Sequence, residues 1–430
     1  MKTIANRNLR LLSFCFMRCS SLLSVVLTVC LCATMARADD PFEIPPIFRA
    51  SELLSEDALK GPDHEIDEFV YNDGINNIYQ LSTTHGPLKA ESTALLKVRL
   101  NELEALQKLE AAKRTTSYAK ALANAAAGPL RLTRDLIIKP VSTLSGVATG
   151  VGSYFRNVGY AISGSKSEQE EGFLKEAIMF ANAKRMVAAR VGVDPYSSYP
   201  PLQERLNSIS WAAYAGGITT SVLFMGIPGT TGTVISGTNF GNQMNERIRT
   251  TAPADLKKLN AKLLKEMEVY KSVAKVFLDH PKYSPTRTTY TVGALELMNG
   301  VADRSIFIER ASLAQDESVA FYFEQQAEFM AGYHGNVAPV ARFVEVGGLP
   351  FLQTKEGVIV GVFPCDHIAW TEDIAARAYG NTAKAVKALY PDATGKELWF
   401  EGTVSSIALR NLEEMGWKVK EKTSQTLMVQ

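Results

Sequence analysis

Apolar residues recur every three or four positions through much of this chain. Between residues 92 and 127, Leu96, Leu100 and Leu103 begin such a stripe while charged residues fill the other face, so we expect a long amphipathic helix. Gly128-Pro129 follows at once, a pairing typical of a helix end. The same spacing predicts further helices at residues 173–191, 201–225, 253–278, 290–299, 304–313 and 317–333.

The period changes near both ends of the chain. Asp73-Gly74 stands between short apolar stretches and predicts a β-hairpin, preceded by a proline-rich, acidic arm with one short helix near residues 51–59. Residues 341–346 and 358–363 are β-branched or aromatic runs that we expect to pair as strands.

The last part of the chain alternates between the two periods. Residues 374–389 and 404–415 favour helix, whereas residues 398–400 and 417–419 favour strand. A strand, a helix and a strand joined by short connections predict a right-handed crossover between parallel neighbours.

These patterns together predict an α+β fold that is predominantly α-helical. We expect a signal peptide over residues 1–38, an irregular arm and hairpin over 39–90, a glycine-rich helical domain over 91–335 and a small α+β domain over 336–430. The chain of 430 residues is long enough to bury a large core.

The first residues of the chain have the pattern of an export signal. Basic residues precede an apolar run over residues 22–32, which leads to Ala36-Arg37-Ala38, an A-x-A cleavage pattern, and no acid occurs before Asp39. We therefore expect a bacterial protein that acts outside the cytoplasmic membrane, in the periplasm, at the envelope or in the medium. Leu27-Thr28-Val29-Cys30 has a lipobox-like outline, so lipidation is the alternative to soluble release.

Cleavage of the signal would change both the charge and the thiol count. The whole chain has 46 basic and 45 acidic residues, and loss of the five basic residues before residue 39 leaves a net charge of −4. A slightly acidic exported chain has no broad electrostatic attraction for nucleic acid, so we expect no nucleic-acid partner. Of the five cysteines only Cys365 would remain, which excludes an intrachain disulfide.

Two glycine-rich segments are open to two interpretations. Residues 140–162 carry an apolar helical stripe beside a stripe of small residues, and residues 206–245 contain no charged residue at all. Within the second segment, residues 209–227 have the length of a membrane span but are diluted by serine, threonine and glycine. Both segments fit either a buried helix with close neighbours or a helix in contact with a membrane.

Candidate chemistry gathers at one place in the sequence. Cys365, Asp366 and His367 lie where a predicted strand ends, and a thiol, a carboxylate and an imidazole can form a nucleophile, an orienting group and a base. The alternative is that Cys365 is a small buried hydrophobe and that Thr371 caps the next helix. Gly159 and Gly164 have phosphate-loop spacing but lack the following residues and the strand, so we expect no nucleotide.

A metal site would need residues from distant parts of the chain. His334 and His367 with Asp366 or Glu328 have suitable ligand chemistry but no local spacing that makes them converge, so the metal content stays unknown and we predict no cofactor. The row Glu317, Glu324 and Glu328 has the spacing of a solvated helix face.

Two functions remain open at this point. The first is a non-enzymatic envelope or secreted protein that binds a membrane or an envelope protein through its helical domain. The second is an extracytoplasmic hydrolase with a site near Asp366 and His367, with Cys365 as its candidate nucleophile.

Overall fold

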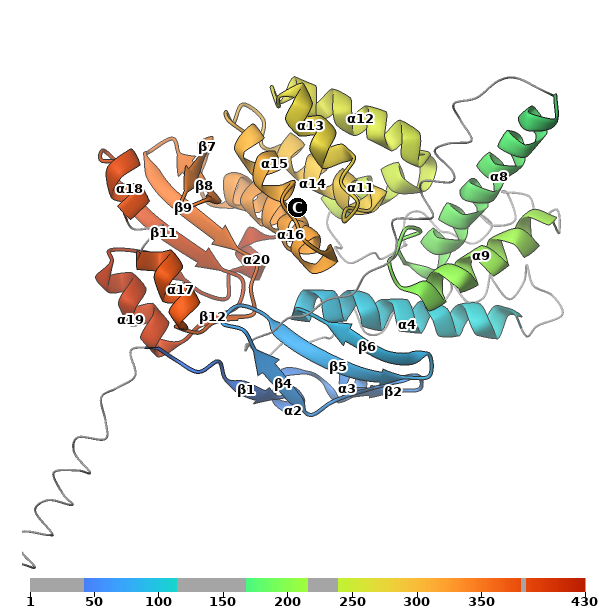
Figure 1. Ribbon diagram of the computed structural model, residues 1–430, viewed down its shortest axis with the longest axis horizontal. Helices are drawn as coiled ribbons and strands as arrows, with labels where there is room; N and C mark the ends of the chain where they lie inside the picture. Colours follow the sequence, from blue (N-terminus) through green and yellow to red (C-terminus); the bar gives the residue numbers. More distant parts are fainter. Residues whose placement is uncertain (1–41, 114–167, 216–238, 380–383, 430) are drawn as a thin grey trace, which may run out of the picture. The chain divides into compact units, whose positions relative to one another are not determined.

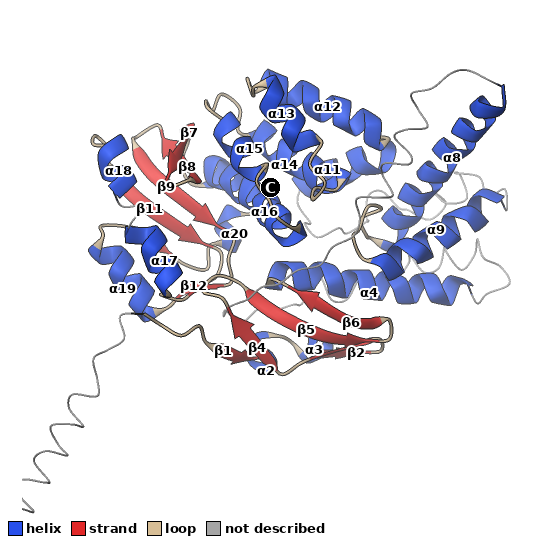
Figure 2. Ribbon diagram, viewed as in Figure 1, coloured by secondary structure: helices blue, strands red, loops and turns tan. Residues whose placement is uncertain are grey.

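The computed structural model describes residues 42–113, 168–215, 239–379 and 384–429 (Figure 1). The predicted signal, the glycine-rich segment 140–162 and most of residues 209–227 lie outside these ranges. About 53% of the described residues are helix and 20% are strand, in several sheets, so the predicted mixed α+β class is confirmed (Figure 2).

The first described part forms a six-stranded antiparallel sheet with two short helices. The predicted hairpin is present, since β4 (Phe69–Asn72) pairs with β5 (Asn77–Thr83) and places Tyr71 opposite Ile78. Gly74 has a φ of +99°, which glycine adopts without steric cost, and the Asn72 side chain accepts a hydrogen bond from its N–H at 2.8 Å. The other strands and helices of this part are β1 (Ile47–Arg49), β2 (Lys60–Gly61), β3 (His64–Ile66), β6 (Gly86–Ala90), α2 (Ala50–Leu53) and α3 (Glu56–Leu59).

The prediction of an irregular arm before the hairpin is wrong at residues 47–49 and 60–61, whereas helix near residues 51–59 is present as the two short helices α2 and α3. Strand β1 pairs with β4, and β2 pairs with β3, to extend the sheet on both sides in the order β1-β4-β5-β3-β2. Strands of two or three residues are too short to show alternation in the sequence, and pairing with a neighbour determines them instead.

The predicted long helix is present as α4 (Thr93–Lys113), and its continuation to residue 127 lies outside the described residues. Its leucine stripe is buried against the first sheet and against the helices α8 (Glu168–Val191) and α9 (Pro200–Ala215). Burial of a leucine side chain stabilises the folded state by roughly 1.5–3 kcal/mol, so this stripe is a main contribution to the first hydrophobic core.

A second core begins with the helices that follow residue 238. They are α11 (Asn239–Thr250), α12 (Pro253–Glu266), α13 (Lys271–Leu278), α14 (Pro285–Leu297), α15 (Ser305–Ala311) and α16 (Glu317–Asn336). Met330 and Tyr333 of α16 belong to the same buried cluster as Phe343 and Val360 of the following strands. Apolar contacts therefore cross residue 335, the predicted boundary between the helical domain and the α+β domain.

The single helix predicted over residues 253–278 is wrong, because the chain turns between α12 and α13. Glu268 has a φ of 62°, and the Val269 N–H donates to the Leu264 carbonyl at 2.9 Å. These are the features of a Schellman helix end, which usually has glycine at the left-handed position. A glutamate there gives no sequence signal for the end of the helix.

The C-terminal sheet has five strands in the order β13-β11-β9-β8-β7. They are β7 (Val340–Val346), β8 (Leu349–Thr354), β9 (Val358–Phe363), β11 (Gly395–Phe400) and β13 (Lys418–Lys420). Helix α19 (Ser406–Glu414) connects β11 to β13, and the predicted parallel pairing of these two strands is confirmed. Helices α17 (Glu372–Ala376) and α18 (Lys384–Leu389) lie with α19 on the side of the sheet away from α16 (Figure 1).

The prediction that residues 341–346 pair directly with 358–363 is wrong, because β8 lies between β7 and β9. Pro350 argues against a central strand in the sequence, since proline cannot donate to the ladder. In the fold it lies outside the part of β8 that pairs with β9, which is Leu352 and Gln353.

Substitution at Gly332 should test how α16 holds the last helix, α20 (Ser424–Leu427). A Cβ at Gly332 would lie 1.8 Å from the Leu427 carbonyl oxygen, whereas a Cβ at Gly335 on the same helix meets nothing within 4 Å. We expect Gly332→Ala to lower the free energy of unfolding by about 1–3 kcal/mol, because the backbone of α20 must move. Urea denaturation measures this difference.

The matched control is Gly335→Ala, which should be neutral or stabilising by up to about 1 kcal/mol, since alanine is the better helix former. Equal stability of the two variants would contradict the close approach of α20 to α16.

Candidate functional site

The predicted cluster at Cys365 lies at the junction of the C-terminal sheet with the first sheet. His367 begins β10 (His367–Ile368), a short strand parallel to β12 (Thr403–Val404). The backbone N–H groups of Asp366 and His367 both donate to the carbonyl of Ile75 in the hairpin turn, each at 3.1 Å. The cluster is therefore where the C-terminal part of the chain binds the hairpin.

Asp366 has a structural role in this geometry. Its Oδ2 accepts hydrogen bonds from the N–H of Asn77 at 2.7 Å and from the N–H of Thr93 at 2.9 Å. Thr93 begins α4, and a carboxylate at a helix N-terminus satisfies a free N–H and is favoured by the helix dipole. Burial raises the pKa of Asp366, and these hydrogen bonds oppose that rise.

Cys365 and His367 are also engaged by neighbouring groups. Burial, together with Asp366 and Glu401, raises the pKa of the Cys365 thiol well above its ordinary value, whereas a nucleophilic cysteine needs a lowered one. His367 shares a hydrogen bond between its Nδ1 and the Thr403 Oγ1 at 2.8 Å. These surroundings favour the structural interpretation of the cluster, and Thr371 caps α17 as expected.

The hypothetical metal ligands occupy separate surroundings. The Nδ1 of His334 accepts a hydrogen bond from the Val340 N–H at 3.1 Å, at the end of α16, while His367 lies at β10. Within the described ranges, no group of three histidine, cysteine or acidic side chains is arranged to hold a metal ion.

Removal of the Asp366 carboxylate should destabilise the fold. We expect Asp366→Ala to lower the free energy of unfolding by about 2–4 kcal/mol, because it leaves the N–H groups of Asn77 and Thr93 without their acceptor. Asp366→Asn is the matched control and should cost less than about 1 kcal/mol, since its carbonyl oxygen still accepts two hydrogen bonds. Urea unfolding of both variants checks this, and equal losses would argue against the capping role.

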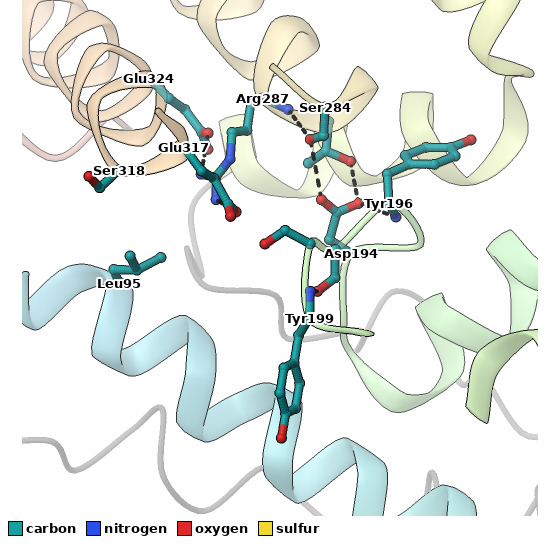
Figure 3. A network of polar contacts seen from close by, with 12 residues as sticks. Leu95, Asp194, Tyr196, Tyr199, Ser284, Arg287, Glu317, Ser318 and Glu324 are labelled. Atoms are coloured by element: carbon teal, nitrogen blue, oxygen red, sulfur yellow. Dashed lines mark hydrogen bonds and ion pairs between the residues drawn. The ribbon is translucent and has the colours of Figure 1, made fainter. Parts of the chain in front are cut away.

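Arg287 is the centre of a buried ionic network that the sequence did not indicate (Figure 3). From α14 it donates to Glu324 at 3.1 Å and to Glu317 at 2.8 Å, both on α16, and its guanidinium lies 4.6 Å from the centre of the Phe321 ring. Arg287 thereby fixes α14 against α16.

Glu317 extends this network to α4. Its second oxygen is 3.3 Å from Arg99, which also donates to Glu102 at 2.7 Å and to Ser198 at 2.9 Å. Ser197 donates to Glu102 from the same loop. One carboxylate, that of Glu317, therefore binds arginines from two different helices.

Asp194 belongs to the loop between α8 and α9 and points toward the start of α14 (Figure 3). It accepts hydrogen bonds from the Thr286 hydroxyl at 2.6 Å and from the Tyr196 N–H at 2.8 Å. Burial raises its pKa, against the effect of these two donors and of Arg287. The loop is thus held to the second core by a buried acid.

The acids of α16 differ sharply in their affinity for a proton. Burial alone would raise the pKa of Glu317, but Arg287 and Arg99 hold it at about 2. Burial raises the pKa of Glu324 to about 7 against the attraction of Arg287, and burial also raises the pKa of Glu328 well above its ordinary value. Glu317 is therefore a permanent anion, whereas Glu324 changes its charge near neutral pH.

The prediction that Glu317, Glu324 and Glu328 form a solvated helix face is wrong. The Glu324 residue is only 8% exposed, and its partner Arg287 is equally buried. Acids at helical spacing look the same whether they face water or buried arginines, and Arg287 is 37 positions away from Glu324. Arg287 and Arg99 are both paired with carboxylates, so the network connects α14, α16 and α4.

The pH dependence of stability should separate the two acids. The folded pKa of Glu324 is raised from 4.5 to about 7, so the folded state holds its proton more tightly and this group makes stability fall as pH rises between these values. We expect Glu324→Gln to remove that fall, which urea unfolding at about pH 5, 6, 7 and 8 measures. Parallel pH profiles of the variant and the wild type would contradict the assignment.

Glu317→Gln should behave in the opposite way. Its folded pKa is lowered from 4.5 to about 2, so its contribution is complete above 4.5 and is lost as pH falls toward 2. Removal of one partner of a buried ion pair costs about 3–5 kcal/mol, and we expect this loss at neutral pH in the same unfolding series.

Exposed apolar side chains gather at one end of the α8 and α9 pair. Ile178 is 65% exposed, Met179 is 51% exposed and Trp211 is 50% exposed. The rings of Phe180 and Trp211 stack with their centres 4.6 Å apart, so Trp211 lies against the turn of α8 that also carries Ile178 and Met179. Large apolar groups that cluster in water mark an interaction site more often than scattered ones do.

Comparison with known proteins gives no independent indication of function. No family model, curated protein or solved structure matches the chain. Within the described ranges, no helix is long and apolar enough to cross a membrane. The function therefore has to be inferred from the surfaces and the buried groups of this chain itself.

Proposed function

We propose that this chain is an exported, non-enzymatic envelope or secreted protein that binds the surface of a membrane through the end of its α8 and α9 pair. The observation that carries the proposal is the exposure of Ile178, Met179 and Trp211 at that end. Their transfer from water to the boundary of a bilayer would be favourable in proportion to the apolar area that they bury.

The composition of this apolar end suits a membrane boundary. Tryptophan combines a large apolar ring with an N–H donor, and it is enriched where acyl chains meet headgroups. Trp211 is held by stacking on Phe180, so little side-chain freedom would be lost when it binds.

The sequence around this end supports the same interpretation. Residues 140–162 precede α8 in the sequence, and the uncharged residues 216–227 follow α9. We propose that the helical part is a glycine-rich domain that uses these segments for contact with lipid, and that the leader over residues 1–38 delivers the protein to the envelope.

A non-enzymatic role fits the surroundings of the candidate catalytic groups. Asp366 accepts two backbone hydrogen bonds, and burial keeps the Cys365 thiol protonated. No nucleotide, nucleic acid or cofactor is needed for the proposed role.

Vesicle flotation tests the proposal directly. The purified protein should float with vesicles of phosphatidylethanolamine, phosphatidylglycerol and cardiolipin, and it should still do so at about 1 M salt, where charge attraction is screened within about 3 Å. We expect the double variant Ile178→Glu with Met179→Glu to bind at least about ten-fold more weakly. It replaces two exposed apolar side chains that the bound protein would bury in the membrane boundary.

The matched control is Val276→Glu with Leu313→Glu, since these two residues are more than half exposed elsewhere in the fold. Trp211 gives a second measurement, because the other three of the four tryptophans are buried. Its fluorescence should shift to shorter wavelength when vesicles are added. Wild-type protein that stays wholly in the soluble fraction, or a control pair that loses binding equally, would refute the proposal.

A further inference from the structure

A cavity of about 340 Å³ lies where the last turn of α16 meets the C-terminal sheet. Its volume is at the lower end of the range for small-molecule sites. The residues that matter for its chemistry are Tyr333, Ala338, Glu356, Val358, Trp399 and Lys420. This site is remote in sequence from the α8 and α9 end and does not depend on the proposed membrane contact.

The cavity has an aromatic wall formed by α16 and β11. Tyr333, three residues before the end of α16, meets Trp399 of β11 edge to face, with ring centres 5.3 Å apart. In the parallel register of β11 and β13, Trp399 lies opposite Lys420 and Glu397 lies opposite Lys418. One wall is thus apolar and the neighbouring edge is charged.

The hydroxyl of Tyr333 is an unused donor at this cavity. The residue is only 2% exposed, and its hydroxyl has no hydrogen-bond partner among the described residues. Burial raises the pKa of Tyr333 to about 12, with Glu397 and Glu356 acting in the same direction, so the hydroxyl keeps its proton at neutral pH. The hydroxyl is therefore a donor that faces the cavity and can donate to an acceptor on a ligand.

The charged groups around the cavity are not equally available. Glu397 already accepts hydrogen bonds from the Trp399 Nε1 at 2.9 Å and from Lys418 at 2.8 Å. Lys420 and Glu356 line the same cavity, and neither side chain has an ion-pair partner among the described residues. Lys420 also acts on Glu397, whose pKa it helps to lower, but Lys420 and Glu356 make no ion pair with a described residue and lie beside an apolar wall.

We propose that this cavity binds a small zwitterion with an apolar side chain, a free hydrophobic amino acid or a dipeptide of such residues. The carboxylate of the ligand is bound by Lys420 and the Tyr333 hydroxyl, the ammonium group is bound by Glu356, and the side chain packs on Trp399 and Val358. A lone anion would leave Glu356 unmatched, and a lone cation would leave Lys420 unmatched.

Calorimetric titration of the full chain with L-leucine and leucyl-leucine tests this assignment. At least one of the two should give saturable binding heat. N-acetylleucine lacks the ammonium group and leucine amide lacks the carboxylate, so each should bind at least about ten-fold more weakly than leucine, the loss expected for one charged hydrogen bond. Capped forms that bind as tightly as leucine would overturn the zwitterion assignment.

Two variants locate the site. Tyr333→Phe removes only the hydroxyl and should weaken binding about five-fold, and Lys420→Met should weaken it about ten-fold or more. The matched controls Tyr379→Phe and Lys422→Met change the same residue types outside the cavity and should bind as the wild type does. Near-ultraviolet circular dichroism confirms that each variant is folded.

The outcomes are distinct from those of the vesicle experiment. Absence of saturable heat with both probes, or variants at Tyr333 and Lys420 that bind as tightly as the controls, would overturn the proposal. Loss of vesicle binding in the Ile178 and Met179 variant should leave the titration unchanged, because the two sites share no residue.

Discussion

The carboxylate of Glu317 joins the two hydrophobic cores of this protein. One oxygen binds Arg287 of α14 and the other binds Arg99 of α4, so the first core, around α4, and the second core, around α14 and α16, share a single, partly buried anion. A buried charge is tolerated only when its partners satisfy it, and here two arginines hold the pKa of Glu317 at about 2. The relative position of α4 and α16 depends on this match.

Asp366 performs the same task at a second place. Its carboxylate accepts hydrogen bonds from the first N–H of α4 and from the N–H of Asn77. These bonds connect the segment after β9 to the first sheet. Acids that resemble catalytic groups in the sequence thus serve as connectors between distant parts of the chain. Cys365, the one cysteine within the described ranges, is buried and free.

The surfaces that remain available for binding lie away from these connectors. The exposed apolar side chains lie on α8 and α9, whose buried residues form part of the first core. The cavity lies beside Tyr333 and Trp399, which belong to the second core. The proposed contact with a membrane and the proposed binding of a small zwitterion use different surfaces of the chain.

Local patterns in the sequence determined the regular elements. The leucine stripe of α4 and the Asp73-Gly74 turn were predicted correctly, because a helical period and a turn residue act over only a few positions. Cys365, Asp366 and His367 were correctly placed at a strand end, but their sequence gave no indication of which groups would surround them.

Only the tertiary structure decided the partners of the buried charges. Arg99 and Glu317 are 218 positions apart, and Thr93 and Asp366 are 273 positions apart. The same acids at the same spacing would be equally consistent with a solvated helix face. The sequence by itself thus determined where helices, hairpin and candidate side chains lie, whereas long-range packing decided which of them are buried, since an ion pair depends on distance in space and not along the chain.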